Sequence, residues 1–393
     1  MISVETALNI LKTNIAPLDK SKICQVFEAA GQVLYEDVLS PIHMPPFQQS
    51  AMDGYAICLH DALIYNLIGE VKAGDSHEPE LKKGEAIRIF TGAPVPKTAN
   101  AVIMQEKVQV VDHKIRIDEP INLGLNIRPA GEQIEQGHVA LKKGTKLTAA
   151  AIGFLASLGI TKISVYEKPT VAILATGNEL VKAGEELAYG QIYESNSVML
   201  EIALTQLGFT EISTYKVDDD YGNTHKILAE IIANHDVILI SGGISVGDYD
   251  FVGKALHELK VKELFYKVNQ KPGKPLFFGK KEDKVIFALP GNPASLLSCF
   301  YIYAQTALQI MSGDSNFTLN RITAKSETIF NSKGDRSQFL KAIYSNGKVR
   351  ILEGQSSSML HTFALANALV YVPASQNEIL INESVELILL PIS

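Results

Sequence analysis

Residues 171–180 have the sequence VAILATGNEL. The first six of them form an apolar run without polar alternation, which is typical of a strand buried on both faces of a sheet. An apolar run followed by a glycine-containing loop returns at 236–243 (DVILISGG) and at 284–292 (KVIFALPGN). Helical segments separate these runs, and strands that alternate with helices are typical of βαβ units. The sequence therefore predicts a doubly wound parallel sheet over residues 169–316.

One predicted helix of this region, 294–311, approaches the length of a membrane span, and residues 285–313 carry no charge. Several Ser, Thr and Gln residues interrupt it, however, and two prolines precede or begin it, so we expect a buried helix and no membrane partner. The other elements predicted here are a strand at 211–217 and helices at 198–207, 223–234 and 251–259.

The N-terminal half predicts shorter elements. Val4–Thr13 and Val26–Val38 are expected to be helical, whereas residues 64–139 contain short alternating runs broken by Gly and Pro, which indicate β structure. Thr148 is a suitable N-cap for a helix that Gly159 would end.

We therefore expect an α/β multidomain protein. After the sheet domain, five segments with a β pattern predict a small closed or sandwiched β domain at the C-terminus, β-barrel-like in architecture. The length of 393 residues is enough for two to three domains of roughly 150 residues each. The predicted division is an elongated, discontinuous linking domain (1–44 and 142–168), a β-rich domain (45–141), the sheet domain (169–316) and the C-terminal β domain (317–393).

Composition excludes some classes of function. Hydrophobic residues make up 46% of the chain and charged residues 20%, which is ordinary for a folded protein. The net charge of −7 gives no overall basic field, so nucleic acid is not an expected partner. Cys24, Cys58 and Cys299 are far apart and odd in number, and the N-terminal residues lack the pattern of a signal peptide. A reducing, cytoplasmic location is expected.

Three loops leave the predicted parallel strands at their carboxyl ends, where open sheets of this kind bind ligands. They are 176–180 (TGNEL), 241–250 (SGGISVGDYD) and 290–295 (PGNPAS). Two of them lead into helix N-termini, whose N–H groups favour an anion, so together they predict a phosphate-bearing ligand. The candidate binding residues in these loops are Thr176, Gly177, Ser241, Gly242, Gly243, Ser245, Gly291 and Asn292.

Acidic residues share this edge: Glu179, the run 218–220, Asp248 and Asp250. A charge run is often only a solvated face, but carboxylates beside a phosphate require a bridging hard cation, and Mg²⁺ fits that need. Lysines approach the last strand of the sheet, in the segment YKVNQKPGKP (266–275). They suit a multiply charged oxyanion, although lysines near Pro-Gly turns are commonly exposed.

Several catalytic motifs are missing from the sequence, among them a Walker A loop, HExxH and CxxC. Residues 243–247 do match GxSxG between a strand and a helix, the context of a hydrolase nucleophile. Ser245 would then be the nucleophile, with Asp283 and His361 as partners, although His361 falls outside the sheet domain. A hydrolase is a minor alternative.

Seven strings occur in the chain in an order typical of one family. They are PPFQQSAMDGYA, RIFTGAPVP, NIRPAGEQI, ILATGNEL, SGGISVGDYD, KPGKP and LPGNPAS. On these strings, which span most of its length, the chain resembles the molybdopterin molybdenumtransferases of MoeA type and is similar to the E domain of gephyrin. Such enzymes use molybdate to insert molybdenum into adenylylated molybdopterin, with Mg²⁺ and with release of AMP.

The resemblance also implies roles for individual residues. Asp53 of SAMDGYA and Thr91 of FTGAP are implied site residues of the N-terminal half, although Asp53 could instead only stabilise a turn. Within the run 218–220 the metal ligand is implied to be Asp219, with Asp218 as the alternative. The remaining implied residues are the metal-binding acids Glu179 and Asp250, the oxyanion-binding lysines Lys267 and Lys271, and the pocket-wall prolines Pro290 and Pro293.

Assembly is implied as well. The resembling family forms homodimers whose site lies between the N-terminal half of one subunit and the sheet domain of the other, and a contact with the molybdopterin adenylyltransferase is expected. The chain departs from the family at Gln133, where an acid is usual, and at Ser356–Ser358, where a glycine is frequent. The alternative functions are those of a molybdopterin adenylyltransferase and of a non-catalytic scaffold like gephyrin.

Overall fold

The computed structural model describes residues 1–244, 251–332 and 334–391. The chain forms two compact units, which are Met1–Lys22 with Tyr166–Ser393, and Ile23–Val165. The second unit is thus inserted into the sequence of the first. The two connections lie within the strands β1 (Ser21–Gln25) and β12 (Lys162–Tyr166).

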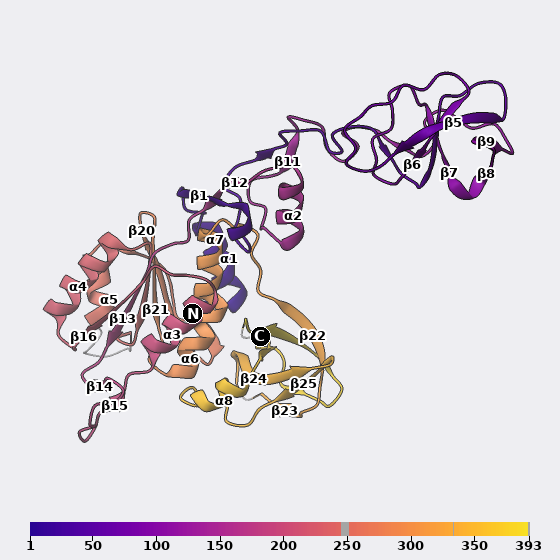
Figure 1. Ribbon diagram of the computed structural model, residues 1–393. Helices are drawn as coiled ribbons and strands as arrows, with labels where there is room; N and C mark the ends of the chain where they lie inside the picture. The colour runs from indigo at the N-terminus through magenta and orange to yellow at the C-terminus, as the bar shows by residue number, and fades with distance from the viewer. Residues whose placement is uncertain (245–250, 333, 392–393) are drawn as a thin grey trace. The chain divides into compact units, whose positions relative to one another are not determined.

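The larger unit contains a six-stranded sheet in the order β16-β13-β17-β21-β20-β18 (Figure 1). Strands β16, β13, β17 and β21 are parallel, as predicted, whereas β20 is antiparallel to both of its neighbours. The strand bounds are β13 (Val171–Thr176), β16 (Ile212–Val217), β17 (Val237–Ser241), β18 (Lys262–Tyr266), β20 (Phe277–Lys281) and β21 (Lys284–Leu289).

Both faces of this sheet are covered by helices (Figure 1). Ile173 and Leu239 are fully buried in one hydrophobic cluster, and their chain neighbours Leu174 and Ile240 are fully buried in another on the opposite face. The first cluster includes residues of α1 (Val4–Asn14), α3 (Asn196–Gln206) and the helical segment 293–311, and the second includes residues of α4 (Tyr221–Asn234) and α5 (Phe251–Glu258). This confirms the strand type predicted from the apolar runs.

The apolar segment 293–311 is helical and almost wholly buried. It consists of α6 (Pro293–Cys299), a π-helical turn η3 (Phe300–Ala304) and α7 (Gln305–Met311). The expectation of a buried helix is therefore confirmed, while the π-helical turn was not predicted. Among the described residues, no helix combines the length and apolar character needed to cross a membrane.

The C-terminal part of the larger unit is a closed β-barrel, as predicted. Its strands follow the order β24-β25-β22-β28-β26, and β26 pairs with β24 to close the ring. The barrel strands are β22 (Arg321–Ser326), β24 (Ser337–Ser345), β25 (Lys348–Ile351), β26 (Ala368–Val372) and β28 (Ser384–Leu389), with β19 (Gln270–Lys271) added beside β24. Small accessory elements are β23 (Phe330–Asn331), β27 (Glu378–Ile379) and α8 (Leu360–Leu365).

The smaller unit holds a sheet in the order β7-β4-β6-β5-β9-β8. Its strands are β4 (Gly54–Ile57), β5 (Ile64–Val71), β6 (Glu85–Ile89), β7 (Ala101–Met104), β8 (Val108–Val111) and β9 (Lys114–Ile117). The predicted helix is α2 (Ala149–Ser157), and the Thr148 hydroxyl accepts a hydrogen bond from the Ala151 N–H. Short elements complete the unit: η1 (Val26–Glu28), β2 (Val38–Leu39), β3 (Gln49–Ser50), η2 (Gln105–Lys107), β10 (Ile127–Arg128) and β11 (Val139–Leu141).

The helix predicted over Val26–Val38 is wrong. Only the short 3₁₀ turn η1 forms, and Gly31 has a φ of +75°, which interrupts a right-handed helix. The Leu34 N–H then donates to the Thr145 carbonyl at 3.0 Å instead of to its own helical turn. Pairing with a distant segment therefore overrides the local helical pattern.

Candidate active site

The carboxyl ends of the parallel strands lie in register. Ala175 is paired with Ser241, and Ser241 with Leu289, so the three predicted loops begin side by side. The pairing of β17 with β21 continues one residue beyond β17, where the Gly242 N–H donates to the Leu289 carbonyl at 3.3 Å. The structure thus brings together the beginnings of the three loops.

Glycine is required in the second loop for steric reasons. Gly243 has a φ of +68°, and a Cβ there would lie 2.5 Å from the Val252 Cγ2 atom. A Cβ on Gly242 would lie 3.1 Å from the Thr176 hydroxyl. The backbone therefore approaches its neighbours more closely than a side chain allows. The predicted residues Ser245 and Asp250, and Asp248, lie outside the described residues.

Two asparagines that the sequence analysis did not select connect the loops. The Asn196 Nδ2 atom donates to the Ser241 Oγ atom at 2.9 Å and to the Gly291 carbonyl at 2.8 Å. The Asn178 Oδ1 atom accepts a hydrogen bond from the Asp219 N–H at 2.9 Å. Asn178 lies inside the TGNEL loop, so its position was a usable signal, whereas nothing local marks Asn196.

The acidic residues of this edge differ in their contacts. Asp220 caps α4, because its carboxylate accepts a hydrogen bond from the Asn223 N–H at 2.7 Å. Asp218, Asp219 and Glu179 are exposed, and the Glu179 carboxylate folds over Gly177. The capping role leaves Asp218 and Asp219 as the ligand candidates of the run.

A preformed metal cluster is not visible in the part of the chain that the structure describes, since no group of three His, Cys, Asp or Glu residues is suitably arranged there. Mg²⁺ commonly takes only one or two carboxylates and completes its shell with water and substrate phosphates. The exposed carboxylates of Asp219 and Glu179 are hard oxygen donors of that kind.

The N–H groups that follow the third loop, at the start of α6, are bound by another part of the protein. The Ala294 and Ser295 N–H groups at the start of α6 donate to the Ser357 carbonyl at 3.1 and 3.3 Å. The Asn292 Nδ2 atom donates to the Ser357 hydroxyl at 2.9 Å. The expectation that these N–H groups await an anion is therefore wrong, because a serine loop of the C-terminal domain caps them.

The lysine segment reaches the same edge of the sheet. Strand β18 ends at Tyr266, whose hydroxyl donates to the Ile244 carbonyl at 2.8 Å. Lys267 follows with a φ of +70°, and its Nζ atom lies 4.7 Å from the centroid of the Tyr266 ring. Lys271 belongs to the separate short strand β19, so the two lysines lie on different segments.

The turn that contains Lys271 lies beside the third loop. A Cβ on Gly273 would lie 3.6 Å from the Cγ atom of Pro290, and Pro293 is the first residue of α6. The acidic loop after β16 and the lysine after β18 stand at opposite ends of the sheet, five strand spacings or about 24 Å apart. The edge therefore offers an acidic end and a basic end.

Asp53 and Thr91 lie in the smaller unit, in direct contact. The Asp53 Oδ1 atom accepts hydrogen bonds from the Thr91 N–H at 2.7 Å and from the Thr91 hydroxyl at 2.8 Å. These two bonds lower the pKa of Asp53 below its ordinary value, and the bond from the Thr91 N–H contributes the larger part. The next residue must be glycine, because a Cβ on Gly54 would lie 1.8 Å from the Ile103 carbonyl oxygen.

The hydrolase alternative requires an acid near the GxSxG loop. Asp283 lies between β20 and β21, at the amino end of the parallel strands, whereas Gly243 follows the carboxyl end of β17. His361 is part of α8 beside the barrel. Asp283 therefore stands at the wrong end of the sheet for a catalytic triad.

Comparison with known proteins agrees with this geometry. Three family models match the chain: the MoeA N-terminal region (domains I and II) at residues 2–159, a probable molybdopterin binding domain at 172–309 and the MoeA C-terminal region (domain IV) at 323–390. The chain is 36% identical to a molybdopterin molybdenumtransferase of Haemophilus influenzae over 81% of its own length and 79% of that protein. The chain belongs to the molybdopterin molybdenumtransferase family.

Other relatives of this transferase family cover more of the chain. A molybdopterin molybdenumtransferase of Staphylococcus epidermidis is 31% identical over 95% of this chain and 91% of its own. The crystal structure of a molybdopterin biosynthesis MoeA protein from Pyrococcus horikoshii OT3 is 32% identical, with a TM-score of 0.83 over 99% of this chain and all of that one. The expected family, fold and transferase activity in molybdenum cofactor biosynthesis are confirmed.

Proposed function

We propose that this transferase takes adenylylated molybdopterin and molybdate, places molybdenum on the dithiolene sulfurs and releases AMP, with Mg²⁺ as its metal. The observation that supports this proposal is the sheet edge, where carboxylates at one end and lysines at the other flank glycine-containing loops, one of which has no room for a side chain at Gly243. An extended substrate with phosphates in its middle suits such an edge.

Asp219, Glu179 and Asp250 are the proposed metal ligands. When bound, Mg²⁺ would neutralise the charge of the substrate's phosphates. Asn178 orients the Asp219 segment through its backbone N–H, and the capping role of Asp220 fixes the end of the same loop. These contacts support Asp219 rather than its neighbours as the ligand.

The residues between the two ends are proposed to bind the pterin and its phosphates: Thr176, Gly177, Ser241, Gly242, Gly243, Ser245, Pro290, Gly291, Asn292 and Pro293. The glycines allow close approach of a ligand to the backbone, and Asn196 keeps the Ser241 and Gly291 loops together. Lys267 and Lys271 are proposed to bind the molybdate dianion, because ammonium groups form charge-assisted hydrogen bonds with oxyanions.

Asp53 and Thr91 are proposed to complete the site in trans, from the partner subunit of a homodimer. Two observations support this. These residues belong to a compact unit separate from the one that carries the sheet edge, and Thr91 holds the Asp53 carboxylate in one orientation. An isologous dimer builds two identical sites of this kind.

Co-expression of Asp53→Ala with Asp250→Ala tests the shared site. In purified mixed dimers, one site carries both changes and the other carries neither, so turnover should return to about half of the wild-type rate per dimer. Sites built within single chains would each carry one change, and turnover would stay low.

A cytoplasmic location is supported by three cysteines placed far apart, and a contact with the molybdopterin adenylyltransferase would hand over the adenylylated substrate. The chain extends well beyond its probable molybdopterin binding domain, which disfavours the adenylyltransferase alternative. Substrate turnover separates the enzyme from a non-catalytic scaffold.

The decisive experiment measures AMP release and molybdenum insertion from adenylylated molybdopterin while molybdate is varied. Lys271→Ala should raise the half-saturating molybdate concentration by about tenfold or more, since a hydrogen bond to a charged group contributes about 1.5–3 kcal/mol. Lys274→Ala, in the same turn, is the matched control. An unchanged molybdate dependence would show that Lys271 does not bind the oxyanion.

A further inference from the structure

A buried polar cluster lies directly beneath the segment that carries the two lysines. We call residues 267–274 the lysine loop. Gln270, in the middle of this loop, is fully buried. Its Nε2 atom donates to the Gly273 carbonyl at 3.2 Å and to the Cys299 Sγ atom at 3.4 Å. Its Oε1 atom accepts a hydrogen bond from the hydroxyl of Tyr303, which is also fully buried.

Tyr303 and Cys299 reach the loop from the helical segment 293–311, whose π-helical turn contains Tyr303. The surroundings are otherwise apolar, since both residues belong to the main hydrophobic cluster. Burial raises the pKa of Tyr303 well above its ordinary value, so the hydroxyl stays protonated and donates a hydrogen bond to Gln270. Buried polar groups are costly unless they are paired, and here Tyr303 pairs with Gln270.

The cluster fits closely against the lysine loop. A Cβ on Gly273 would lie 2.4 Å from the Cys299 Sγ atom, so the turn sits directly on this side chain. Gln270 and its neighbour Lys271 form β19, which pairs with Ser337 and Gln338 of the barrel. Two adjacent residues thus have opposite environments, with the Gln270 side chain buried and that of Lys271 exposed.

The loop is also fixed at its ends by backbone hydrogen bonds. The Lys267 N–H donates to the Leu276 carbonyl at 3.2 Å, and the Val268 N–H to the Lys274 carbonyl at 3.0 Å. The Ile2 N–H donates to the Lys267 carbonyl at 3.3 Å. These bonds hold the two ends of the loop, and between them the loop is held by its pairing with the barrel and by the buried contacts of Gln270 and Gly273.

We propose that Gln270 and Tyr303 are positioning residues for oxyanion binding: their buried hydrogen bond holds the lysine loop so that Lys271 faces the molybdate at the sheet edge. The pair touches no substrate and acts only through the loop. This inference rests on the proposed role of Lys271, and it adds a specific requirement for a tyrosine hydroxyl inside the apolar helix.

Tyr303→Phe tests it, because the change removes only the hydroxyl and keeps the ring in the core. The half-saturating molybdate concentration should rise about five- to tenfold, while the half-saturating concentration of adenylylated molybdopterin stays within twofold of wild type. Tyr301→Phe is the matched control. Tyr301 lies on the same helical segment and packs against Phe300 and Phe363, and it is not one of the hydrogen-bond partners of the Gln270 side chain.

Amide hydrogen exchange gives a second readout that does not depend on turnover. In Tyr303→Phe, exchange should become faster in residues 267–274 and stay unchanged in β17 and β21. Unchanged exchange in the loop, or equal changes in the half-saturating concentrations of both substrates, would overturn the positioning role.

The double variant Tyr303→Phe with Lys271→Ala separates this inference from the proposed function. If Tyr303 acts through Lys271, its effect on molybdate dependence should disappear once Lys271 is replaced. If Lys271→Ala alone leaves molybdate dependence unchanged, the oxyanion role of the lysine is wrong. If Lys271→Ala has its effect but Tyr303→Phe adds a full effect of its own, the positioning role is wrong.

Discussion

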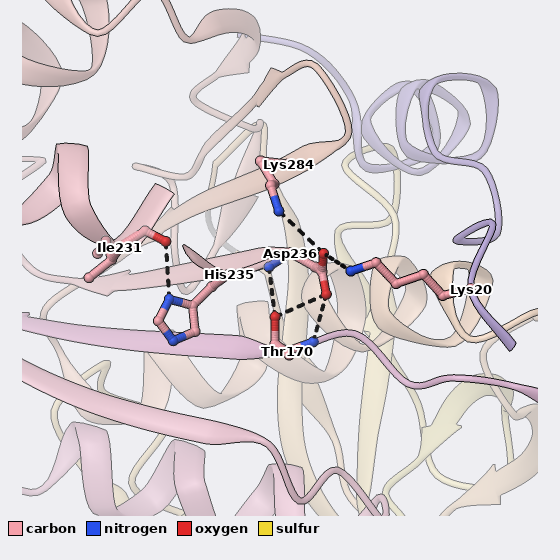
Figure 2. A network of polar contacts seen from close by, with 6 residues as sticks. All are labelled: Lys20, Thr170, Ile231, His235, Asp236 and Lys284. Carbon is pink, nitrogen blue, oxygen red and sulfur yellow. Dashed lines mark hydrogen bonds and ion pairs between the residues drawn. The ribbon is translucent and has the colours of Figure 1, made fainter. Parts of the chain in front are cut away.

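The charged side chains at the two edges of the parallel sheet differ in whether other protein groups pair with them. At the amino edge, Thr170, Asp236 and Lys284 stand at the starts of β13, β17 and β21, and their polar atoms are paired with one another and with Lys20 (Figure 2). At the carboxyl edge, the loops after β13 and β17 carry glycines with positive φ, and exposed carboxylates follow β13 and β16. One edge stabilises the protein, and the other remains open for a ligand.

Asp236 is the centre of the amino-edge network. Its side chain is 5% exposed, and it accepts hydrogen bonds from the Thr170 N–H at 3.0 Å and from the Lys20 ammonium at 2.9 Å. Burial alone would raise the pKa of Asp236, but the Thr170 and Lys20 hydrogen bonds outweigh it and lower the pKa to about 2. A carboxylate this strongly bound by the protein has little capacity left for a ligand.

An acid that is available to a ligand differs from a structural acid in how many protein donors its carboxylate already accepts from. Asp236 and Asp219 both lie next to strands of one sheet, yet only Asp236 has its carboxylate saturated by protein donors. Replacing Asp219 should therefore change activity and leave stability intact, while replacing Asp236 should do the reverse.

The largest expected effect is on the carboxyl edge. Asp219→Asn should lower turnover at limiting Mg²⁺ by roughly a hundredfold, because the change removes a proposed metal ligand at the point where charge would be neutralised. The melting temperature should stay within about 1 °C of wild type, since the carboxylate is exposed. Asp218→Asn is the control, and a larger metal effect there would move the ligand role to Asp218.

Asp236→Asn should act on stability instead. The pKa of about 2 lies below that of an unfolded aspartate, so ionised Asp236 stabilises the fold at neutral pH by about 2 kcal/mol. This contribution is present above pH 4 and is lost as the pH falls toward 2. Urea unfolding should show the difference between wild type and variant at pH 7 and a smaller one in acid. Equal differences at both pH values would contradict the role of the charge.

A smaller effect is expected for Asp220→Ala, which removes the N-cap of α4. Loss of a cap of this kind costs about 1 kcal/mol of unfolding free energy. Although Asp220 is adjacent to Asp219, the Mg²⁺ dependence of turnover should not change. A shifted metal titration would show that the capping residue also binds the ion.

The smallest effect is expected for Lys20→Met. The Lys20 side chain is 51% exposed, so water and salt screen its ion pair with Asp236. Unfolding free energy should fall by less than about 1 kcal/mol, and the loss should shrink further in 0.5 M salt, about where screening becomes strong. A loss as large as that in Asp236→Asn would mean that Lys20, rather than Thr170, dominates the network.

The sequence predicted the sheet and barrel well because their signals are local. VAILAT and DVILIS contain strands buried on both faces, and an unbroken apolar run is the local pattern that predicts such a strand. Long-range pairing was not readable in the same way. The bond from Leu34 to Thr145 replaced a predicted helix, and the cap that Ser357 provides for α6 joins residues more than sixty positions apart. Of the site, the loops could be predicted, but not the contacts of Asn196 and Gln270 that hold them.

The insertion of the smaller unit has a consequence for biosynthesis. Helix α1 is translated before the inserted unit, but the sheet and helix residues that share its hydrophobic cluster with Val4 and Leu11 lie beyond position 170. The inserted unit, residues 23–165, is contiguous and has its own hydrophobic clusters, so it can fold during translation. Over the same period α1 has no sheet to pack against. Because α1 is amphipathic, its apolar face stays exposed for the time needed to translate about 150 residues, roughly eight to thirty seconds at about 5–20 residues per second. During that interval α1 is a binding segment for chaperones on the nascent chain.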